Sequence, residues 1–265
     1  MTRGRRSMTA EMTGARRWFR RHPARPGAPR LVCFPHAGGG ASSYHGWARG
    51  LAPRVEVLAV CYPGREDRFH EPPAASVEAL ADEIAAALPL SRERPLVLFG
   101  HSMGATVAFE VARRIERACP DGLARLCVSG RPAPHATPPS AIHLLSDDAF
   151  VEDLRSLEGT AGDILDSADF RSLFLPGIRA DYRLIENYRP TPGARISAPV
   201  TAYCGTEDPH VRPGQMRRWK EVTDGSFASR IFPGGHFYLL EQLPSVVADV
   251  AGLLGVEPCH EAPPA

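Results

Sequence analysis

Apolar and polar positions along the chain fall into alternating blocks that predict strands and helices in turn. Six short apolar runs each have the length of a buried strand, and they lie at residues 30–35, 55–62, 95–100, 123–130, 199–205 and 226–232. Other stretches have apolar residues every three or four positions, as amphipathic helices do; they lie at residues 76–88, 104–118, 215–223 and 244–255. Apolar strands separated by helices indicate a mostly parallel sheet with helices on both faces, which is an α/β fold.

One segment interrupts this alternation. Residues 131 to about 195 begin with the proline-rich "RPAPHATPPS" and continue with three amphipathic stretches, at residues 146–157, 163–175 and 177–188. Because the segment lies between two sheet strands, we interpret it as a helical lid over the carboxyl edge of the sheet. Residues 28–265 are then one domain with a lid insertion.

Charge is concentrated at the start of the chain, where the first 30 residues contain nine arginines and one glutamate. We interpret residues 1–27 as a basic, disordered tail, with a docking patch for an acidic protein as the alternative. Nucleic-acid binding is not expected, because the rest of the chain is acidic and has no recognition motif. No apolar run approaches the roughly 20 residues of a membrane span, so no membrane contact is expected.

Cysteines have no spacing typical of a metal site or a disulfide framework, although the chain contains six of them. Cys33, Cys61, Cys127 and Cys204 lie within or at the ends of apolar runs, where cysteine behaves as a small apolar residue. We expect buried free thiols, no bound metal and a cytoplasmic location.

The candidate chemistry begins with "GHSMG", in which Ser102 lies between Gly100 and Gly104. The motif G-x-S-x-G places a nucleophilic serine at a sharp turn when a strand precedes it and a helix follows it, as the apolar pattern predicts here. A serine corner with no catalytic role is the structural alternative.

A serine nucleophile needs a base, and the base needs a carboxylate to orient it. "YCGTEDPHV" follows the predicted strand 199–205 and offers two carboxylates, of which Asp208 is favoured because the following proline holds it extended; Glu207 stays open as the alternative. His236, in the glycine-rich loop after the last strand, is the expected base.

Backbone amides are needed for the oxyanion of the reaction intermediate. Met103, directly after the serine, and Ala37, in the "PHAGGG" loop after the first predicted strand, are the expected donors. We expect His36 and His101 to make local hydrogen bonds instead of acting as the base.

Several segments together resemble the type II thioesterases of polyketide and nonribosomal peptide synthesis, which have the α/β-hydrolase fold. "PHAGGG", "YPGRE", "GHSMG" and "PGGHFYL" carry the resemblance, which extends from about residue 18 to residue 254. One departure is Cys61, which stands where the family usually has glutamine. The resemblance implies Ser102 as nucleophile, Asp208 as acid, His236 as base, and Ala37 and Met103 as the oxyanion donors.

The implied substrate is an acyl group on the phosphopantetheine arm of a carrier domain, and the implied task is to release stalled or aberrant acyl units. The arm enters as part of the substrate, so no cofactor is expected. Acyl-loaded carrier domains are the expected partners, and a monomer is the default state. A general serine esterase acting on small acyl esters, a chain-releasing or cyclising thioesterase domain of a synthase, and a non-catalytic interaction protein remain the alternatives.

Overall fold

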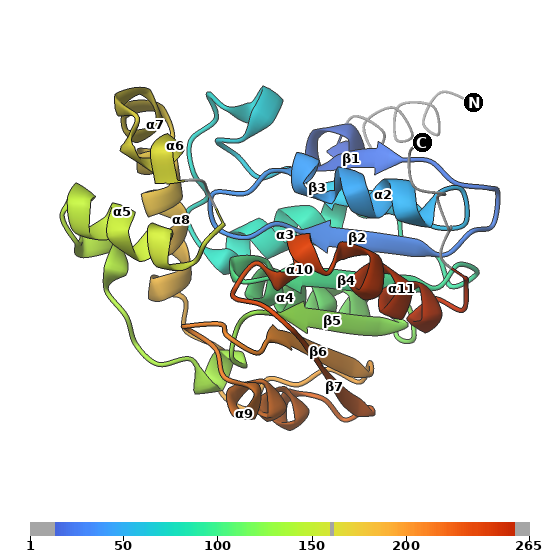
Figure 1. Ribbon diagram of the computed structural model, residues 1–265. Coiled ribbons are helices and arrows are strands. Elements are labelled where there is room, and N and C mark those ends of the chain that lie inside the picture. The colour runs from blue at the N-terminus through green and yellow to red at the C-terminus, as the bar shows by residue number, and fades with distance from the viewer. Residues whose placement is uncertain (1–13, 160–161, 258–265) are drawn as a thin grey trace.

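The computed structural model describes residues 14–159 and 162–257, which build a seven-stranded sheet (Figure 1). The strands are β1 Phe19–His22, β2 Arg30–Phe34, β3 Glu56–Val60, β4 Leu96–His101, β5 Arg125–Ser129, β6 Val200–Gly205 and β7 Phe227–Phe232. Their order is β1-β3-β2-β4-β5-β6-β7, with β1 antiparallel to β3 and the other neighbours parallel. The predicted α/β fold is confirmed, and each of the six predicted runs coincides with one strand to within two residues at either end.

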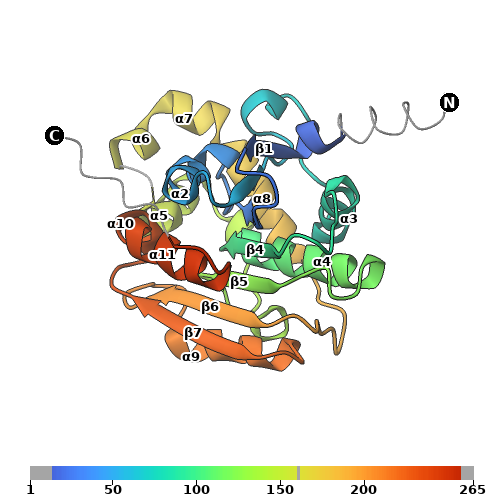
Figure 2. The same ribbon diagram turned by 90° about the vertical axis from the view of Figure 1, so that its right-hand side faces the viewer.

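Helices cover both faces of this sheet, as Figure 2 shows with α3 and α4 on one side and α2 and α11 on the other. Their bounds are α2 His45–Leu51, α3 Val77–Ala87, α4 Met103–Ala118, α9 Pro213–Met216, α10 Tyr238–Glu241 and α11 Leu243–Leu253. Strand β2 illustrates the packing: Val32 and Phe34 belong to the core under α3 and α4, whereas Leu31 and Cys33 belong to the core under α2 and α11. All four side chains are fully buried, which explains why the central strands are apolar without alternation.

The segment between β5 and β6 is helical, and we call residues 131–195 the helical insertion. It contains α5 Asp147–Ser156, α6 Gly162–Asp166, α7 Ala168–Leu173 and α8 Leu175–Asn187. Figure 1 shows these helices beyond the carboxyl ends of the parallel strands. They share a small apolar cluster of their own, formed by Phe150, Val151, Leu165 and Leu175.

The N-terminal segment differs from the expected tail. Residues 1–13 lie outside the described part of the chain, but Phe19–His22 form the edge strand β1, so the interpretation of a disordered tail over residues 1–27 is wrong there. Trp18 and Phe19 are 4% and 5% exposed and belong to the main core. The guanidinium group of Arg68 lies 4.1 Å from the centre of the Trp18 ring. Burial of these two aromatic side chains stabilises the folded segment, although charged residues surround them in the sequence.

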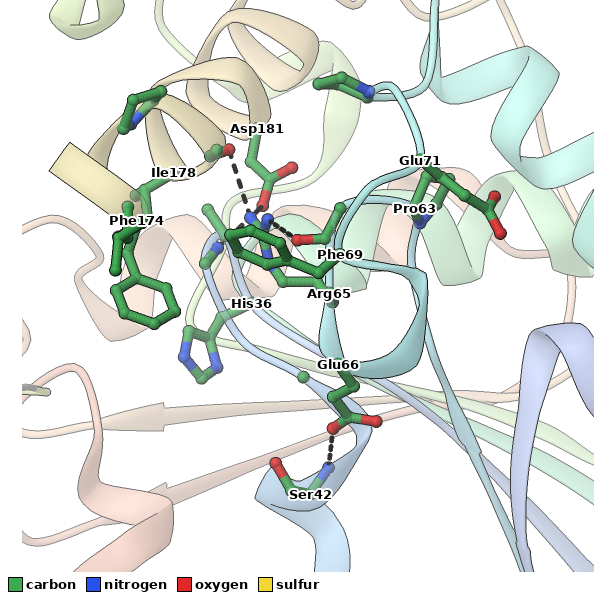
Figure 3. Close-up of a pocket in the computed structure, with 18 of the residues that line it drawn as sticks. His36, Ser42, Pro63, Arg65, Glu66, Phe69, Glu71, Phe174, Ile178 and Asp181 are labelled. Atoms are coloured by element: carbon green, nitrogen blue, oxygen red, sulfur yellow. Dashed lines mark hydrogen bonds and ion pairs between the residues drawn. The ribbon is translucent and has the colours of Figure 1, made fainter. Parts of the chain in front are cut away.

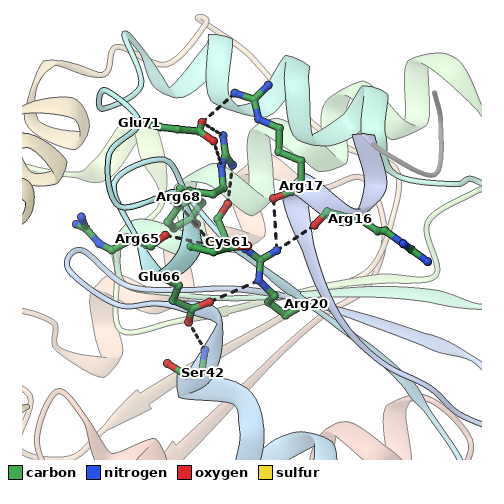
Figure 4. Close-up of polar contacts among 11 residues, drawn as sticks. Arg16, Arg17, Arg20, Ser42, Cys61, Arg65, Glu66, Arg68 and Glu71 are labelled. Atoms are coloured by element: carbon green, nitrogen blue, oxygen red, sulfur yellow. Dashed lines mark hydrogen bonds and ion pairs between the residues drawn. The ribbon is translucent and has the colours of Figure 1, made fainter. Parts of the chain in front are cut away.

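Arginines of the same segment pair with carboxylates of the loop that follows β3 (Figure 4). Arg17 donates to Glu71 at 2.8 Å, and Arg20 lies 3.7 Å from Glu66. Glu71 also accepts from Arg68, and Glu66 accepts from the backbone amide of Ser42. Arg17 and Arg20 are therefore part of the network that supports the loop containing "YPGRE".

The cysteines within the described residues fit the expectation of free thiols. Cys33, Cys61, Cys127 and Cys204 are buried and free, Cys119 is free and half-buried, and Cys259 lies outside the described residues. In the same part of the chain, no helix is long and apolar enough to cross a membrane.

Candidate active site

Ser102 occupies the turn between β4 and α4, with a backbone φ of 53° and ψ of −121°. A positive φ is strained for a residue other than glycine, and it persists where the surrounding structure fixes the backbone. The Ser102 amide donates to the carbonyl oxygen of Ser129 on the neighbouring strand β5, at 2.8 Å. The turn therefore holds the serine at the carboxyl edge of the sheet, as the motif predicts.

Gly100 and Gly104 allow the backbone to approach itself closely at this turn. A Cβ atom on Gly100 would lie 2.2 Å from the carbonyl oxygen of Gly104. A Cβ atom on Gly104 would lie 2.1 Å from the carbonyl oxygen of Phe34, at the end of β2. Both obstacles are backbone atoms of the sheet and helix, so any side chain at either position would displace the turn.

Asp208 and His236 form a hydrogen-bonded pair at the ends of β6 and β7. His236 Nδ1 lies 2.8 Å from Asp208 Oδ2, and the two residues are 4% and 7% exposed. Asp208 Oδ1 accepts from the backbone amides of His210 and Val211, at 2.9 and 3.1 Å. Glu207 is exposed, so the structure favours Asp208 over Glu207 as the partner of the histidine.

The predicted site residues meet at one cavity of about 160 Å³. Ser102, Met103, Ala37 and His236 line it, and Asp208 lies behind His236. Met103 is the first residue of α4, so its amide is one of those that a helix leaves without an intrahelical acceptor. The structure thus brings together all five residues expected from the sequence.

His101 makes the local hydrogen bond that was expected of it. Its Nδ1 lies 2.9 Å from Ser129 Oγ, which in turn lies 2.7 Å from the Tyr238 hydroxyl. Its ring centre lies 4.9 Å from that of His236. Burial lowers the pKa of His101 well below its usual range, and His236 lowers it further. The neutral form of His101 is therefore favoured.

His36 packs near His101, with ring centres 6.0 Å apart, and its ring centre lies 4.8 Å from that of Phe237. Burial, with contributions from His236 and Arg65, lowers the pKa of His36 to about 4. Close packing explains a glycine nearby, since a Cβ atom on Gly39 would lie 2.7 Å from the His36 ring. Among the described residues, the His36 ring does not make the local hydrogen bond that was expected. It packs instead against the rings of His101 and Phe237.

A second, larger cavity of about 480 Å³ shares the lining residue Ala37 with the first. Figure 3 shows this larger cavity. The loops after β2 and β3 form one side of it, and residues of α7 and α8, Leu173 and Ile178 among them, form the other. Phe69 and Phe174 also line it, with ring centres 6.2 Å apart.

Arg65 and Asp181 join the two sides of this cavity, and sequence reasoning missed this pair. Arg65 donates to Asp181 Oδ2 at 2.5 Å, and the same oxygen accepts from the Gly38 amide at 2.8 Å. Burial raises the pKa of Asp181, while Arg65 and the Gly38 amide oppose that shift. Arg65 belongs to the quoted motif "YPGRE", but nothing in the local sequence of α8 marks Asp181. Asp181 thus connects the helical insertion both to the loop that carries Arg65 and to the loop that carries Ala37.

The sheet order, the serine turn after β4 and the Asp208–His236 pair define a protein of the α/β-hydrolase class. The chain belongs to the thioesterase family, since the family model for the thioesterase domain matches residues 29–254.

Similarity to known proteins indicates which type of thioesterase the chain resembles. The chain is 44% identical to Thioesterase PikA5 of Streptomyces venezuelae, over 88% of this chain and 84% of that protein. It is 43% identical to a probable cadicidin biosynthesis thioesterase of Streptomyces griseus, over 97% of this chain and 70% of that protein. Among solved structures, it matches the type II thioesterase BorB from the borrelidin biosynthetic cluster with a TM-score of 0.80 and 46% identity, over 89% of this chain and 97% of that one. The resemblance to type II thioesterases is confirmed.

Proposed function

We propose that this protein hydrolyses acyl thioesters carried on the phosphopantetheine arm of carrier domains, and so releases stalled or aberrant acyl groups from a polyketide or nonribosomal peptide synthase. The main support is the meeting of Ser102 and the Asp208–His236 pair at one cavity, in a chain of the thioesterase family. The arm arrives as part of the substrate, and the chemistry needs no cofactor.

In the first step, Ser102 Oγ attacks the thioester carbonyl carbon while His236 Nε2 accepts the serine proton. Asp208 prepares this step, because its Oδ2 accepts the hydrogen bond from Nδ1–H and leaves the lone pair on Nε2. The two backbone amides on Asp208 Oδ1 hold the carboxylate in place.

The negative charge that develops on the substrate oxygen needs donors that are already oriented. The amides of Met103 and Ala37 have that role in the proposal, since both residues line the serine cavity. Loss of one such donor typically costs on the order of 10² to 10³ in rate.

The thiol of the arm then leaves with a proton from His236, and an acyl-serine remains. A water molecule activated by His236 attacks this ester, the acid is released, and Ser102 recovers its proton. A thiol has a pKa near 8.5 by analogy with cysteine, so it leaves with less assistance than an amine.

The adjoining cavities suit a substrate with two parts. The larger cavity, at about 480 Å³, has room for an arm beside Phe69 and Phe174, and the smaller one, at about 160 Å³, for a short acyl group beside Ser102.

The test is hydrolysis of a propionyl-loaded carrier protein, followed by release of the free arm thiol, with a p-nitrophenyl ester as the second substrate. We expect carrier turnover to exceed ester turnover and to fall at least about 1,000-fold in Ser102→Ala. Ser172→Ala is the matched control, because Ser172 is exposed on α7, and its activity should equal that of the wild type. Ester cleavage without carrier turnover would identify a general serine esterase instead.

A further inference from the structure

The cavity beside Ser102 is lined by more polar groups than the hydrolysis uses. Besides the reacting residues, the side chains around it include Arg131, Asp153, Tyr182, Glu186 and His210. A cavity that only had to hold a plain alkyl chain would be lined by apolar side chains, because a buried polar group costs free energy unless it is hydrogen-bonded.

Most of these polar groups have partners within the protein. Glu186 accepts from the Ser140 hydroxyl and from the backbone amides of Ile142 and His143. Arg131 Nε donates to the hydroxyl of Thr106 at 3.1 Å. Neither residue has a fully buried side-chain nitrogen or oxygen that lacks a hydrogen-bond partner.

Asp153, on α5, is different. Its Oδ2 is buried and has no hydrogen-bond partner, and it is the one buried side-chain oxygen in this condition within residues 14–159 and 162–257. Burial raises the pKa of this carboxyl, while the charge of His210, a side-chain hydrogen bond with Tyr182 and the charge of His236 oppose the shift. Leaving a buried acceptor unpaired costs about 1–3 kcal/mol, so a bound group that donated to it would recover that free energy.

We propose that Asp153 binds a hydrogen-bond donor on the acyl group, so that the site favours short acyl groups with an amino or hydroxyl substituent next to the carbonyl. The inference rests on the proposed thioesterase function and names the substrate class of the same site. Ser102, His236 and Asp153 line the same cavity of about 160 Å³. An acyl group bound to Ser102 would therefore lie in the space that the Asp153 carboxyl also faces. The aspartate χ2 torsion is broad and nearly two-fold, so either carboxyl oxygen can turn toward the cavity.

Three acyl groups of the same shape test this proposal: alanyl, lactyl and isobutyryl, each as the N-acetylcysteamine thioester. They differ only in an ammonium, a hydroxyl or a methyl group on the same carbon. We expect the wild type to hydrolyse the alanyl or lactyl thioester with a kcat/KM about 10- to 100-fold above that of the isobutyryl thioester, after subtraction of spontaneous hydrolysis.

In Asp153→Leu, this ratio should fall to near one while isobutyryl hydrolysis is retained. Asp153→Asn removes the charge with little change in shape, so it serves if the leucine variant does not fold, and it should reduce alanyl hydrolysis more than lactyl hydrolysis. Glu152→Gln is the matched control, because Glu152 is the exposed neighbour on the same helix, and it should keep the wild-type ratio.

An unchanged ratio in both Asp153 variants would overturn the proposal, as would a wild type that hydrolyses the three thioesters equally. If none of the three is hydrolysed by the wild type and carrier-bound acyl groups are also untouched, the proposed function itself fails. The two failures are therefore distinguishable.

Discussion

The sheet with its loops and the helical insertion contribute to the same cavities but are built differently. Helix α4, behind the serine, has eleven buried residues among its sixteen, whereas α7 in the insertion has none. Ile164, Leu173 and Phe174 of the insertion are about half exposed, at 48%, 55% and 50%. Ser102, Asp208 and His236 all lie on the sheet side, where dense packing fixes their geometry. The insertion supplies residues that shape the space around the substrate.

The links that hold the two regions also differ. Several ion pairs within the insertion are solvent-exposed, such as Arg171–Asp148 and Arg179–Asp147, and pairs of this kind contribute little to stability. Arg65–Asp181, between the two regions, is largely buried, with side-chain exposures of 12% and 11%. A pair in this position is sensitive to the loss of either partner, because the other charge would remain buried.

The largest effect should come from the sheet side, at Asp208. Asp208→Asn keeps the shape of the side chain but no longer fixes the proton of His236 on Nδ1, so we expect kcat to fall by about 10⁴-fold. Steady-state hydrolysis of an acyl-carrier substrate measures this. Glu207→Gln changes the exposed neighbour and should leave kcat within about two-fold of the wild type. A larger loss in Glu207→Gln than in Asp208→Asn would reverse the assignment of the acid.

The glycine of the serine turn should be the next most sensitive position. In Gly104→Ala the new methyl group would meet the Phe34 carbonyl oxygen, so we expect the free energy of unfolding to fall by about 3 kcal/mol. Gly252, in α11, has open space around it, and Gly252→Ala should raise the free energy of unfolding by about 0.5–1 kcal/mol. Urea denaturation of both variants gives the comparison, and shifts of the same sign would contradict it.

The link between the regions should have an intermediate effect on catalysis. Asp181→Asn removes the charge that Arg65 pairs with and weakens the acceptor of the Gly38 amide, next to Ala37. A small displacement of that loop would misplace the oxyanion donor, so we expect kcat to fall about 10- to 100-fold with a smaller change in KM. Arg183→Gln, at an exposed position on the same helix, is the control and should retain the wild-type kcat. A change in KM alone would indicate that the pair acts on substrate binding and not on the loop.

The sheet side could be predicted from sequence more fully than the insertion, for a physical reason. Its central strands, β2 to β6, are buried on both faces, so they are continuous apolar runs, and its reactive residues follow strands that end at the same edge. Strand β1 was missed because "FRRH" is mostly charged. An edge strand pairs with one neighbour, so it need not be apolar on both faces. The apolar residues Trp18 and Phe19 were the feature of the local sequence that indicated burial.

The roles of Asp153 and Asp181 could not be predicted in the same way. The insertion was expected to be helical from its periodicity, and it is. Which acidic residue of an amphipathic helix faces the sheet depends on how the helix is placed against it, and that placement is set by contacts distant in sequence. Asp181 reaches Gly38 across 143 positions of the chain.

Replacing Leu173 should have the smallest effect on stability. It should also separate most clearly the contribution of the insertion to substrate binding from that of the sheet to stability. It is 55% exposed on α7 and lines the larger cavity, so Leu173→Ala should change the free energy of unfolding by less than about 0.5 kcal/mol while raising KM for the acyl-carrier substrate a few-fold. Leu98→Ala makes the same chemical change at a fully buried position of β4 and should cost about 2–5 kcal/mol. Thermal or urea denaturation and a KM measurement on the two variants distinguish a role in folding from a role in substrate binding. A large loss of stability in Leu173→Ala would mean that this side chain supports folding, whereas an effect confined to KM would mean that the insertion keeps it exposed for the substrate.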